Sequence, residues 1–331
     1  MVFELYLLGP NKAPQKIAKL PAHLEGGFVC IGNFDGMHQG HHALIARAAA
    51  LADRKGTNFG ILSFAPHPRR YFVPKAPPFL LSSLAQRMEA ARDFGASWFA
   101  LAPFEDELVA MDAAQFTQIF LHQHLHVEGI VVGPGFRFAH RRKGTVQDFV
   151  AAGFEVAEVE LIRNKKHKIS STAIRQALTS GAVSDANQML GRPFAITGIV
   201  EQGEKIGRTI GFPTANVQLG CYIRPAYGVY CVRVRLNDGS EARDSGLLTG
   251  VANLGCRPSI DKAGEPRLEV HLFEYTANLY GRSLTVLFDR LLRFEQKFDN
   301  LDALKAQIAR DCEQGRAFYS GPNCEHGCRL S

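Results

Sequence analysis

The sequence of 331 residues has no run of about 20 apolar residues, the length that a membrane-spanning helix needs. Its first residues, Met1–Leu5, lack the basic start and the long apolar core of a secretory signal. No internal repeat and no low-complexity segment is present. No Gly-x-x-x-x-Gly-Lys-Ser/Thr motif occurs, which excludes a nucleotide site of the P-loop type. These absences predict a cytoplasmic protein with no membrane partner.

Cysteine is scarce and scattered. The seven cysteines are an odd number, which favours reduced thiols over a disulfide framework. The single local cluster, Cys324 to Cys328 with His326 between them, has two readings. It could hold a metal, but it lacks a second ligand pair and lies in a polar terminal segment. We therefore expect residues 317–331 to be a flexible tail.

The charge is mildly basic. Lys plus Arg is 38, Asp plus Glu is 32, and the net charge is +6. This balance suits small anionic substrates. The sequence has no basic block with interleaved aromatic residues, so it does not predict a nucleic acid partner. The basic run 163–168 fits a solvated loop and a phosphate-facing loop equally well.

The most informative stretch is Gly32–His41. It follows the apolar run Phe28–Ile31, typical of a buried parallel strand, and precedes the strong helix former Ala43–Ala52. Backbone N–H groups and the positive end of a helix dipole would therefore point at one spot, which suits a phosphate. Glycines alone would fit a plain structural loop just as well.

The first part of the chain alternates strand and helix patterns. This alternation predicts a doubly wound parallel sheet. Two prolines in Ala65–Arg70 predict an extended loop that presents His67 and Arg69 at the carboxyl edge of the sheet. The expected strands are Phe28–Ile31, Phe59–Phe64, Trp98–Leu101, Gly129–Gly133 and Phe154–Leu161, and the expected helices are His42–Lys55, Ser83–Phe94, Asp112–Leu125 and Thr145–Ala152.

After Gly181 the pattern changes to strands separated by Gly or Pro turns, with one short helix at Ser184–Leu190 and a terminal helix at Leu301–Glu313. This order predicts a small antiparallel β-barrel. We therefore expect domains at residues 1–184 and 185–316. The expected strands are Phe194–Glu201, Tyr227–Leu236, Thr249–Leu254, Arg267–Tyr275 and Leu284–Leu291.

The pattern Gly-Asn-Phe-Asp-Gly-x-His-x-Gly-His at 32–41 resembles the HxGH signature of nucleotidyltransferases, and Ile169–Arg175 matches the second signature of that superfamily. The resemblance implies a Rossmann-like fold in which His38 and His41 hold the phosphates of ATP and Arg175 faces the same anion. It also implies ATP contacts at Gly32, Asn33, Phe34, Asp35, Gly36, Gly40, Ser170, Ser171 and Thr172. Contacts on the FMN side would come from His67, Arg69, Phe136 and Arg137.

The run Gly207–Asn216 resembles the signature of riboflavin kinases, and five later blocks of that pattern follow in order, ending with Arg293–Phe298. The resemblance implies that Thr214 and Asn216 bind Mg²⁺ and that Glu295 is the base that accepts the proton of the ribityl hydroxyl. Without the motif, Glu295 would be read as a surface acid. The other implied contacts are Gly207, Arg208, Gly211 and Pro213 for ATP, and Asn253 and Arg293 for the flavin.

Together these motifs resemble the bacterial bifunctional riboflavin kinase/FAD synthetase family. Membership would imply that the second domain phosphorylates riboflavin to FMN and that the first transfers AMP from ATP to FMN, which yields FAD and pyrophosphate. ATP, riboflavin, FMN and FAD would be the substrates and products, with Mg²⁺ as cofactor. An oligomer is possible but not required.

Two positions depart from the family pattern. Ala65 stands where a Glu is common, and Gly135 stands where an Asp or Asn is usual. A lost polar contact costs about 0.5–1.5 kcal/mol, which would slow FAD synthesis by about tenfold without abolishing it. We therefore expect an active but weakened synthetase.

Three rival interpretations remain from the sequence. One is a riboflavin kinase with a weakened or inactive first domain, and the intact histidines argue against it. Another is a flavin-binding sensor without ATP turnover. The third is a different nucleotidyltransferase fused to an unrelated barrel, which the riboflavin kinase signature disfavours.

Overall fold

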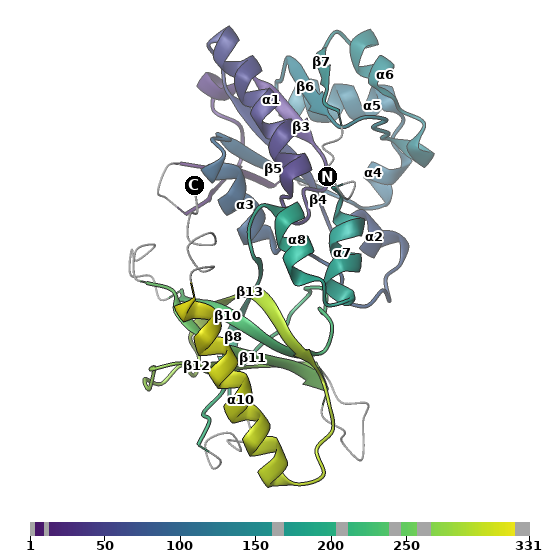
Figure 1. Ribbon diagram of the computed structural model, residues 1–331. Helices are drawn as coiled ribbons and strands as arrows, with labels where there is room; N and C mark the ends of the chain where they lie inside the picture. The colour runs from purple at the N-terminus through teal and green to yellow at the C-terminus, as the bar shows by residue number, and fades with distance from the viewer. Residues whose placement is uncertain are drawn as a thin grey trace. The chain divides into compact units, whose positions relative to one another are not determined.

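The computed structural model describes residues 4–9, 13–160, 169–202, 211–237, 246–256 and 266–321. They fall into two compact units (Figure 1). The first unit comprises Met1–Pro77 and Leu84–Ser170, and the second comprises Pro78–Ser83 and Ser171–Ser331.

The first unit is built on a seven-stranded sheet of order β2-β1-β5-β4-β3-β6-β7. The five strands from β5 to β7 in this order are parallel, which confirms the predicted parallel sheet. At the other end of the sheet, β1 pairs with β5 and β2 pairs with β1, both antiparallel. The sequence did not predict this antiparallel pairing. The strands are β1 (Glu4–Leu7), β2 (Gln15–Ile17), β3 (Phe28–Ile31), β4 (Phe59–Ala65), β5 (Trp98–Pro103), β6 (Gly129–Val132) and β7 (Glu155–Glu158).

Helices cover both faces of this sheet. Buried residues of α1 and α3 pack in one apolar cluster, and those of α4, α5, η2 and α6 pack in a second. The predicted helix at 112–125 is α5 followed by the π-helical segment η2. The helices are η1 (Ala22–Leu24), α1 (Gln39–Lys55), α2 (Pro68–Phe72), α3 (Leu84–Asp93), α4 (Asp106–Ala110), α5 (Ala113–Phe116), η2 (Thr117–His124), η3 (His140–Arg142) and α6 (Val146–Ala151).

The prediction of an extended loop after β4 was wrong. The Ala65–Pro66 peptide bond is cis, and Pro68 begins the short helix α2. Proline suits this first helical position because its fixed φ matches the helix and its missing N–H would have no partner there. The side chain of His67 caps this helix by accepting a hydrogen bond from the backbone N–H of Arg69 (3.1 Å).

The second unit is a closed antiparallel barrel of order β10-β11-β12-β9-β8-β13. The barrel confirms the predicted architecture, but the sequence did not reveal the short strand β9, which carries part of the Thr214–Asn216 motif. The strands are β8 (Phe194–Glu201), β9 (Ala215–Val217), β10 (Gly228–Leu236), β11 (Leu248–Cys256), β12 (Pro266–Leu272) and β13 (Ser283–Phe294), and the helices are α7 (Ser171–Thr179), α8 (Val183–Leu190) and α10 (Leu301–Ser320).

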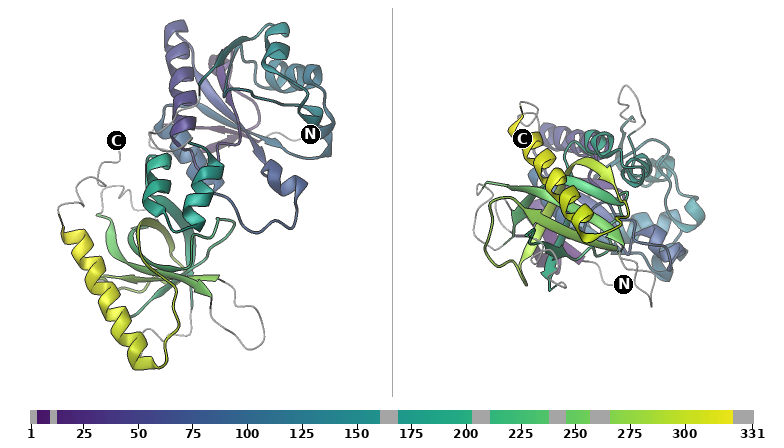
Figure 2. Two further views of the ribbon diagram at one scale, coloured as in Figure 1. Left: turned by 45° about the vertical axis from the view of Figure 1, so that its right-hand side comes forward. Right: turned by 60° about the horizontal axis from the view of Figure 1, so that its bottom comes forward.

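Helix α10 lies along the barrel (Figure 2). Near its middle, Asp311 accepts a bidentate ion pair from Arg293 of β13. Towards its C-terminus, the hydroxyl of Tyr319 donates to Asp289 (2.9 Å), which also pairs with Arg233. Burial and the adjacent carboxylate raise the pKa of Tyr319 well above its ordinary value, so this phenol stays a donor. Because α10 runs to Ser320, the prediction of a flexible tail from residue 317 was wrong for 317–320, and 322–331 lie outside the described residues.

The division between the units falls at Ser170–Ser171, before the boundary predicted at residue 184. Helix α8 is tied to the barrel through Asn187. Its side chain donates to the carbonyl of Phe288 and accepts from the N–H of Phe194, both at 2.8 Å. Helix α7 packs on α8 and also belongs to the second unit. The domain boundary at residue 184 therefore stays a prediction.

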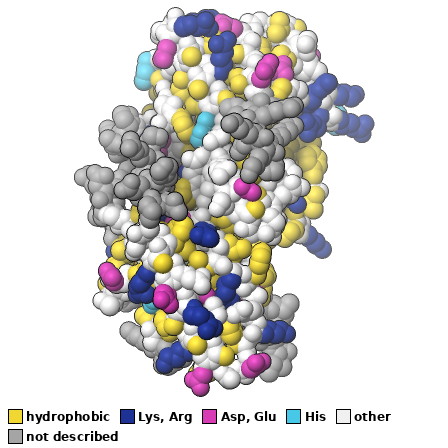
Figure 3. All heavy atoms as spheres, in the orientation of Figure 1, with side chains coloured by type: hydrophobic (Ala, Val, Ile, Leu, Met, Phe, Trp, Pro, Cys, Tyr) yellow, Lys and Arg dark blue, Asp and Glu magenta, His cyan; other side chains and the backbone are white. Residues whose placement is uncertain are grey.

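On the face drawn in Figure 3, basic and acidic side chains are scattered among neutral ones. Across the described part of the chain, no helix combines the length and the apolar character that a membrane crossing requires. Within the same residues, no group of three or more His, Cys, Asp or Glu side chains could hold a metal ion. The Cys324–Cys328 cluster lies outside the described residues.

A close approach of β4 and β5 allows a direct test of this packing. Gly60 lies opposite the fully buried Trp98, and a Cβ added to Gly60 would meet the indole ring at 2.0 Å. We expect Gly60→Ala to lower the free energy of unfolding of the first unit by about 1–3 kcal/mol, because the added methyl overpacks the core. Trp98 is the only tryptophan, so its fluorescence during urea unfolding reports on this unit.

The matched control for this test is Gly133→Ala. A Cβ at Gly133, just after β6, would meet nothing within 4 Å. The control should unfold like the parent protein. Equal urea midpoints for all three proteins would contradict the described packing of β4 against β5.

Candidate active sites

The first candidate site is the turn that links β3 to α1. Its residues carry strained backbone: Phe34 and Met37 adopt positive φ values of 49° and 41°, although both have side chains. Both side chains are fully buried. Non-glycine residues in this region persist where the surrounding structure over-determines them, and such residues cluster at functional sites.

His38 and His41 lie together at the start of α1. The two rings stack with centroids 3.7 Å apart and planes 13° apart. His38 is the N-cap of the helix, and its Nδ1 lies 3.3 Å from the backbone nitrogen of His41, which donates to it. Gly40 leaves room for this stack, since a Cβ there would approach the His38 ring to 3.1 Å. The structure thus brings the two predicted histidines to one helix N-terminus, where an anion is favoured.

Aromatic side chains gather where β4 and β5 end. Tyr71 and Phe72 of α2 contact Phe104, which follows β5, at ring-centroid distances of 5.5 and 5.9 Å. Phe64 of β4 adds an edge contact with Phe104 at 5.8 Å. The side chain of Phe72 remains 64% exposed. We call Phe64, Tyr71, Phe72 and Phe104 the aromatic cluster. Its members Phe64 and Tyr71 lie before and after the predicted residues His67 and Arg69 in the chain. The sequence patterns did not reveal this cluster.

The loop after β6 carries the other predicted FMN-side residues. Phe136 stacks at 6.1 Å on Phe138, a buried residue that itself stacks on Phe149. Arg137 is exposed. Gly135 has a φ of 66°, and its N–H donates to the carboxylate of Glu158 (2.8 Å). Because β3, β4 and β6 are adjacent and parallel, this loop, the histidine turn and α2 all follow strand ends at one edge of the sheet.

The second nucleotidyltransferase signature is split between the units. Ser170 closes the first unit, whereas Ser171 and Thr172 begin α7 in the second. Arg175 of α7 donates from Nε to the carbonyl of Phe79 (2.8 Å), and its guanidinium lies over the Phe79 ring. The predicted nucleotide contacts of these residues stay predictions.

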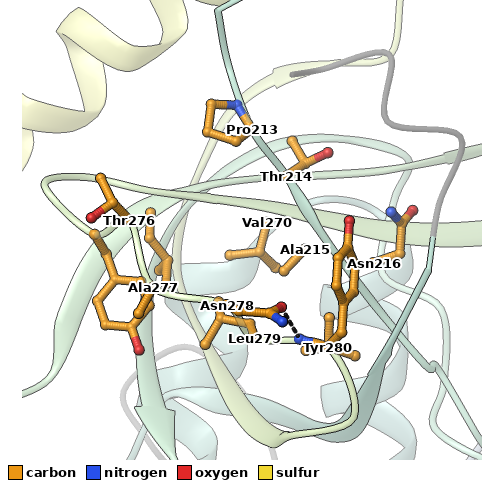
Figure 4. Close-up of a pocket in the computed structure, with 13 residues that line it drawn as sticks. Pro213, Thr214, Ala215, Asn216, Val270, Thr276, Ala277, Asn278, Leu279 and Tyr280 are labelled. Carbon is orange, nitrogen blue, oxygen red and sulfur yellow. Dashed lines mark hydrogen bonds between the residues drawn. The ribbon is translucent and has the colours of Figure 1, made fainter. Parts of the chain in front are cut away.

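The second candidate site is a cavity of about 440 Å³ on the barrel (Figure 4). Pro213, Thr214 and Asn216 line one part of it. The segment Tyr275–Tyr280 also lines it. The riboflavin kinase pattern in the sequence includes Leu279 and Tyr280, but no site role was predicted for them. The remaining lining residues are Val200, Ala215, Val270 and Leu272.

The side chain of Asn216 has a missing hydrogen-bond partner that a ligand would supply. Its Oδ1 is buried and has no hydrogen-bond partner among the described residues. A buried polar atom left unpaired is costly, which points to a bound group that supplies the missing partner. The Asn216 amide oxygen and the Thr214 hydroxyl, which line the same cavity, are hard oxygen ligands of the kind that Mg²⁺ prefers. The residues present therefore fit the magnesium ion that the riboflavin kinase signature implies.

A smaller cavity of about 60 Å³ holds the predicted base. Asn253, Glu269 and Glu295 line it, together with Gly255, Cys256 and Arg267. Glu295 lies against Gly255, where an added Cβ would meet its Oε1 at 2.3 Å. Nearby, a hydrogen bond with Cys256 raises the pKa of Tyr227 to about 12, so the phenol stays protonated.

Glu269 is a second carboxylate. It begins one of the blocks that resemble riboflavin kinases, but no role was predicted for it. In the barrel register Glu269 of β12 lies directly opposite Asn216 of β9 on one side and Asn253 of β11 on the other. Directly opposed residues have Cβ atoms about 4.5–5.5 Å apart. Glu269 therefore connects the predicted metal ligand to the small cavity. Only the pairing of strands distant in sequence shows this.

Arg293, predicted to contact the flavin, has structural partners. Its Nε and Nη2 bind Asp311 of α10, and its Nη1 donates to the carbonyl of Phe294 (3.1 Å). The flavin contact stays a prediction, as do the ATP contacts of Gly211 and Pro213. Gly207, Arg208 and the basic run 163–168 lie outside the described residues.

Comparisons with known proteins agree with this division of sites. The family model described as FAD synthetase matches residues 20–173, and the model described as riboflavin kinase matches residues 190–319. The chain is 37% identical over 301 residues to the bifunctional riboflavin kinase/FMN adenylyltransferase of Haemophilus influenzae, covering 90% of this chain and 96% of that protein. It is 38% identical to the Escherichia coli protein of the same name, covering 89% and 93%.

Among solved structures, the chain is similar to a protein from Streptococcus pneumoniae whose title calls it a macrolide-efflux protein. The TM-score is 0.79 at 30% identity, with 88% of this chain and 94% of that chain covered. This likeness extends over both units. Two domain matches in the expected order and full-length relatives in two organisms lead to one conclusion: the chain belongs to the bifunctional riboflavin kinase/FMN adenylyltransferase family.

Proposed function

We propose that the histidine turn of the first unit is the site of FMN adenylylation and that the two barrel cavities are the site of riboflavin phosphorylation. Both activities follow from the family, and ATP, riboflavin and FMN are the substrates. The observation that carries the assignment is the buried, unpartnered Oδ1 of Asn216 for the kinase half, matched by the stacked histidines at the α1 N-terminus for the other.

At the histidine turn, adenylyl transfer requires the FMN phosphate to attack the α-phosphorus of ATP while pyrophosphate leaves. His38 and His41 would donate to phosphate oxygens whose charge grows as that bond breaks. The α1 N-terminus adds backbone N–H groups and a positive dipole. In the aromatic cluster Phe64, Tyr71, Phe72 and Phe104, the 64% exposed ring of Phe72 offers an apolar surface against which a flavin ring would pack.

Replacement of His38 by alanine tests this half. We expect His38→Ala to lower the rate of FAD formation from FMN and ATP by about a hundredfold or more, because a charge-stabilising donor and the α1 N-cap are both lost. Riboflavin phosphorylation by the same preparation should be unchanged and serves as an internal control for folding.

His42→Ala is the matched control on the same helix. His42 packs against Phe94 with ring centroids 4.2 Å apart and has no proposed contact with substrate. It should retain most FAD synthesis. A His38→Ala enzyme that forms FAD at the parental rate would remove this turn from the reaction.

In the barrel, Thr214 and Asn216 would hold Mg²⁺ beside the ATP phosphates. When bound, the ion would withdraw negative charge from the phosphate oxygens. The ribityl hydroxyl of riboflavin attacks the γ-phosphorus, the bond from that phosphorus to the bridging oxygen breaks so that ADP leaves, and a carboxylate in the small cavity accepts the hydroxyl proton. The sequence resemblance favours Glu295 as this base. The register favours Glu269, which lies directly across from Asn216, whereas Glu295 is exposed and lies beside Gly255.

The two carboxylates can be separated by matched substitutions. We expect Glu269→Gln to lower riboflavin kinase turnover by about 10²–10⁴-fold, the contribution of a positioned general base. Glu295→Gln should cost much less. FAD formation from supplied FMN should stay unchanged in both variants and reports that the rest of the chain is intact.

A steric variant gives an independent reading. In Gly255→Ala the new Cβ would displace the Glu295 carboxylate, since the two atoms would be 2.3 Å apart. If Glu269 is the base, this variant keeps most kinase activity. A large loss in both Gly255→Ala and Glu295→Gln, with Glu269→Gln active, would assign the base to Glu295 instead.

The predicted weakening of FAD synthesis can be tested at Gly135. A Cβ there would meet nothing within 4 Å, and asparagine tolerates the φ of 66° better than most residues. We expect Gly135→Asn to raise kcat/KM for FAD synthesis by up to about tenfold through a regained polar contact. Gly153→Asn is the control, because Gly153 also has a positive φ and open surroundings. Equal gains in both variants, or none, would count against a substrate contact at position 135.

A riboflavin kinase with an inactive first domain is not favoured, because the FAD synthetase model matches that domain and the predicted histidines are in place. We propose a cytoplasmic location, as the sequence predicts, and no oligomer is required for either site.

A further inference from the structure

A buried arginine lies beneath the histidine turn. Arg87 of α3 is only 6% exposed, although its guanidinium is charged at any physiological pH. Neither motif of the adenylyltransferase includes this residue. It contacts the turn directly.

One guanidinium nitrogen of Arg87 serves two acceptors. Nη1 donates to the carbonyl of Asn33 and to the hydroxyl oxygen of Ser63, both at 3.0 Å. Ser63, a fully buried residue of β4, donates in turn to the same Asn33 carbonyl at 3.1 Å. A triangle of Arg87, Ser63 and Asn33 therefore fixes one peptide of the turn from α3 and β4 together.

The fixed peptide immediately precedes the strained part of the turn. Phe34 follows Asn33 and adopts a φ of 49°. Such a conformation is unfavourable for a residue with a side chain and needs firm support on either side. The Asn33 carbonyl supplies that support, because it is held by a charged donor and by a buried hydroxyl at once.

Holding a carbonyl does not require a charge. Burial of a guanidinium carries a large desolvation cost, and a neutral donor could satisfy the same oxygen at a smaller one. What the charge adds is a positive potential behind a turn proposed to bind a triphosphate. Because Arg87 is buried, solvent screens this potential only weakly, and it adds to the positive potential of the α1 N-terminus.

We propose that Arg87 is a positioning residue for adenylyl transfer: through the Asn33 carbonyl it holds the turn in its ATP-binding conformation. Ser63 is the second member of this support. The proposal rests on the assignment of the turn as the ATP site, and the His38→Ala experiment tests that assignment separately.

The experiment compares Arg87→Met, Arg87→Lys and Ser63→Ala in the full-length enzyme. For Arg87→Met we expect kcat for FAD synthesis to fall at least tenfold and KM for ATP to rise at least fivefold, with KM for FMN unchanged. Riboflavin kinase activity should stay at the parental level. Arg87→Lys keeps the charge and one donor, so it should recover a substantial part of the loss.

The split between the two KM values distinguishes positioning from general destabilisation. Loss of folded enzyme lowers kcat but leaves both KM values as they were, because the remaining molecules bind normally. Ser63→Ala should raise KM for ATP in the same direction. The double variant Arg87→Met/Ser63→Ala should lose less than the product of the single losses, because both act on one carbonyl.

Arg92→Met is the matched control, since Arg92 lies on the same helix and binds its neighbour Asp93. It should leave both activities and both KM values unchanged. The proposal is overturned if Arg87→Met synthesises FAD with a parental KM for ATP, or if Arg87→Lys recovers nothing while remaining folded by Trp98 fluorescence. If His38→Ala is inactive and Arg87→Met is not, only this inference fails.

Discussion

The parallel pairing of β3 with β4 and with β6 is the constraint on which the adenylyltransferase half depends. Parallel strands end at the same edge of a sheet, so the segments that follow them must meet there. The histidine turn follows β3, the aromatic cluster follows β4 and β5, and the Phe136 loop follows β6. The proposed contacts with the nucleotide and with the flavin therefore come from separate segments at one edge of the sheet.

In the barrel, strand register brings the candidate site residues together. Antiparallel pairing places Asn216, Glu269 and Asn253 in one row across β9, β12 and β11. Their alternate neighbours, such as Ala215 and Leu268, point into the core and are buried. A shift of one residue would exchange these two sets, so core packing also fixes the polar row.

Helix α10 packs on the outside of the barrel and is bound to it by side-chain contacts. The Arg293–Asp311 pair and the Tyr319–Asp289–Arg233 network attach it at two separated positions. Removal of one partner from such a buried pair leaves the other charge uncompensated, so each pair strongly favours a single arrangement. Arg293 lies two residues before Glu295, which ties the end of β13 to this attachment.

The sequence by itself determined the two halves, their order and most of their elements. Apolar runs such as Phe28–Ile31 and the glycine-rich turn before Ala43–Ala52 depend on local pattern, which a sequence displays directly. Motif residues such as His38 and Asn216 were found for the same reason. Only the tertiary structure decided the short strand β9, the pairing of Glu269 with Asn216, the attachment of Arg293 to Asp311 and the support of Asn33 by Arg87. Each of these depends on residues distant in sequence that are brought together by strand register or by side-chain packing, and a linear pattern carries no record of either.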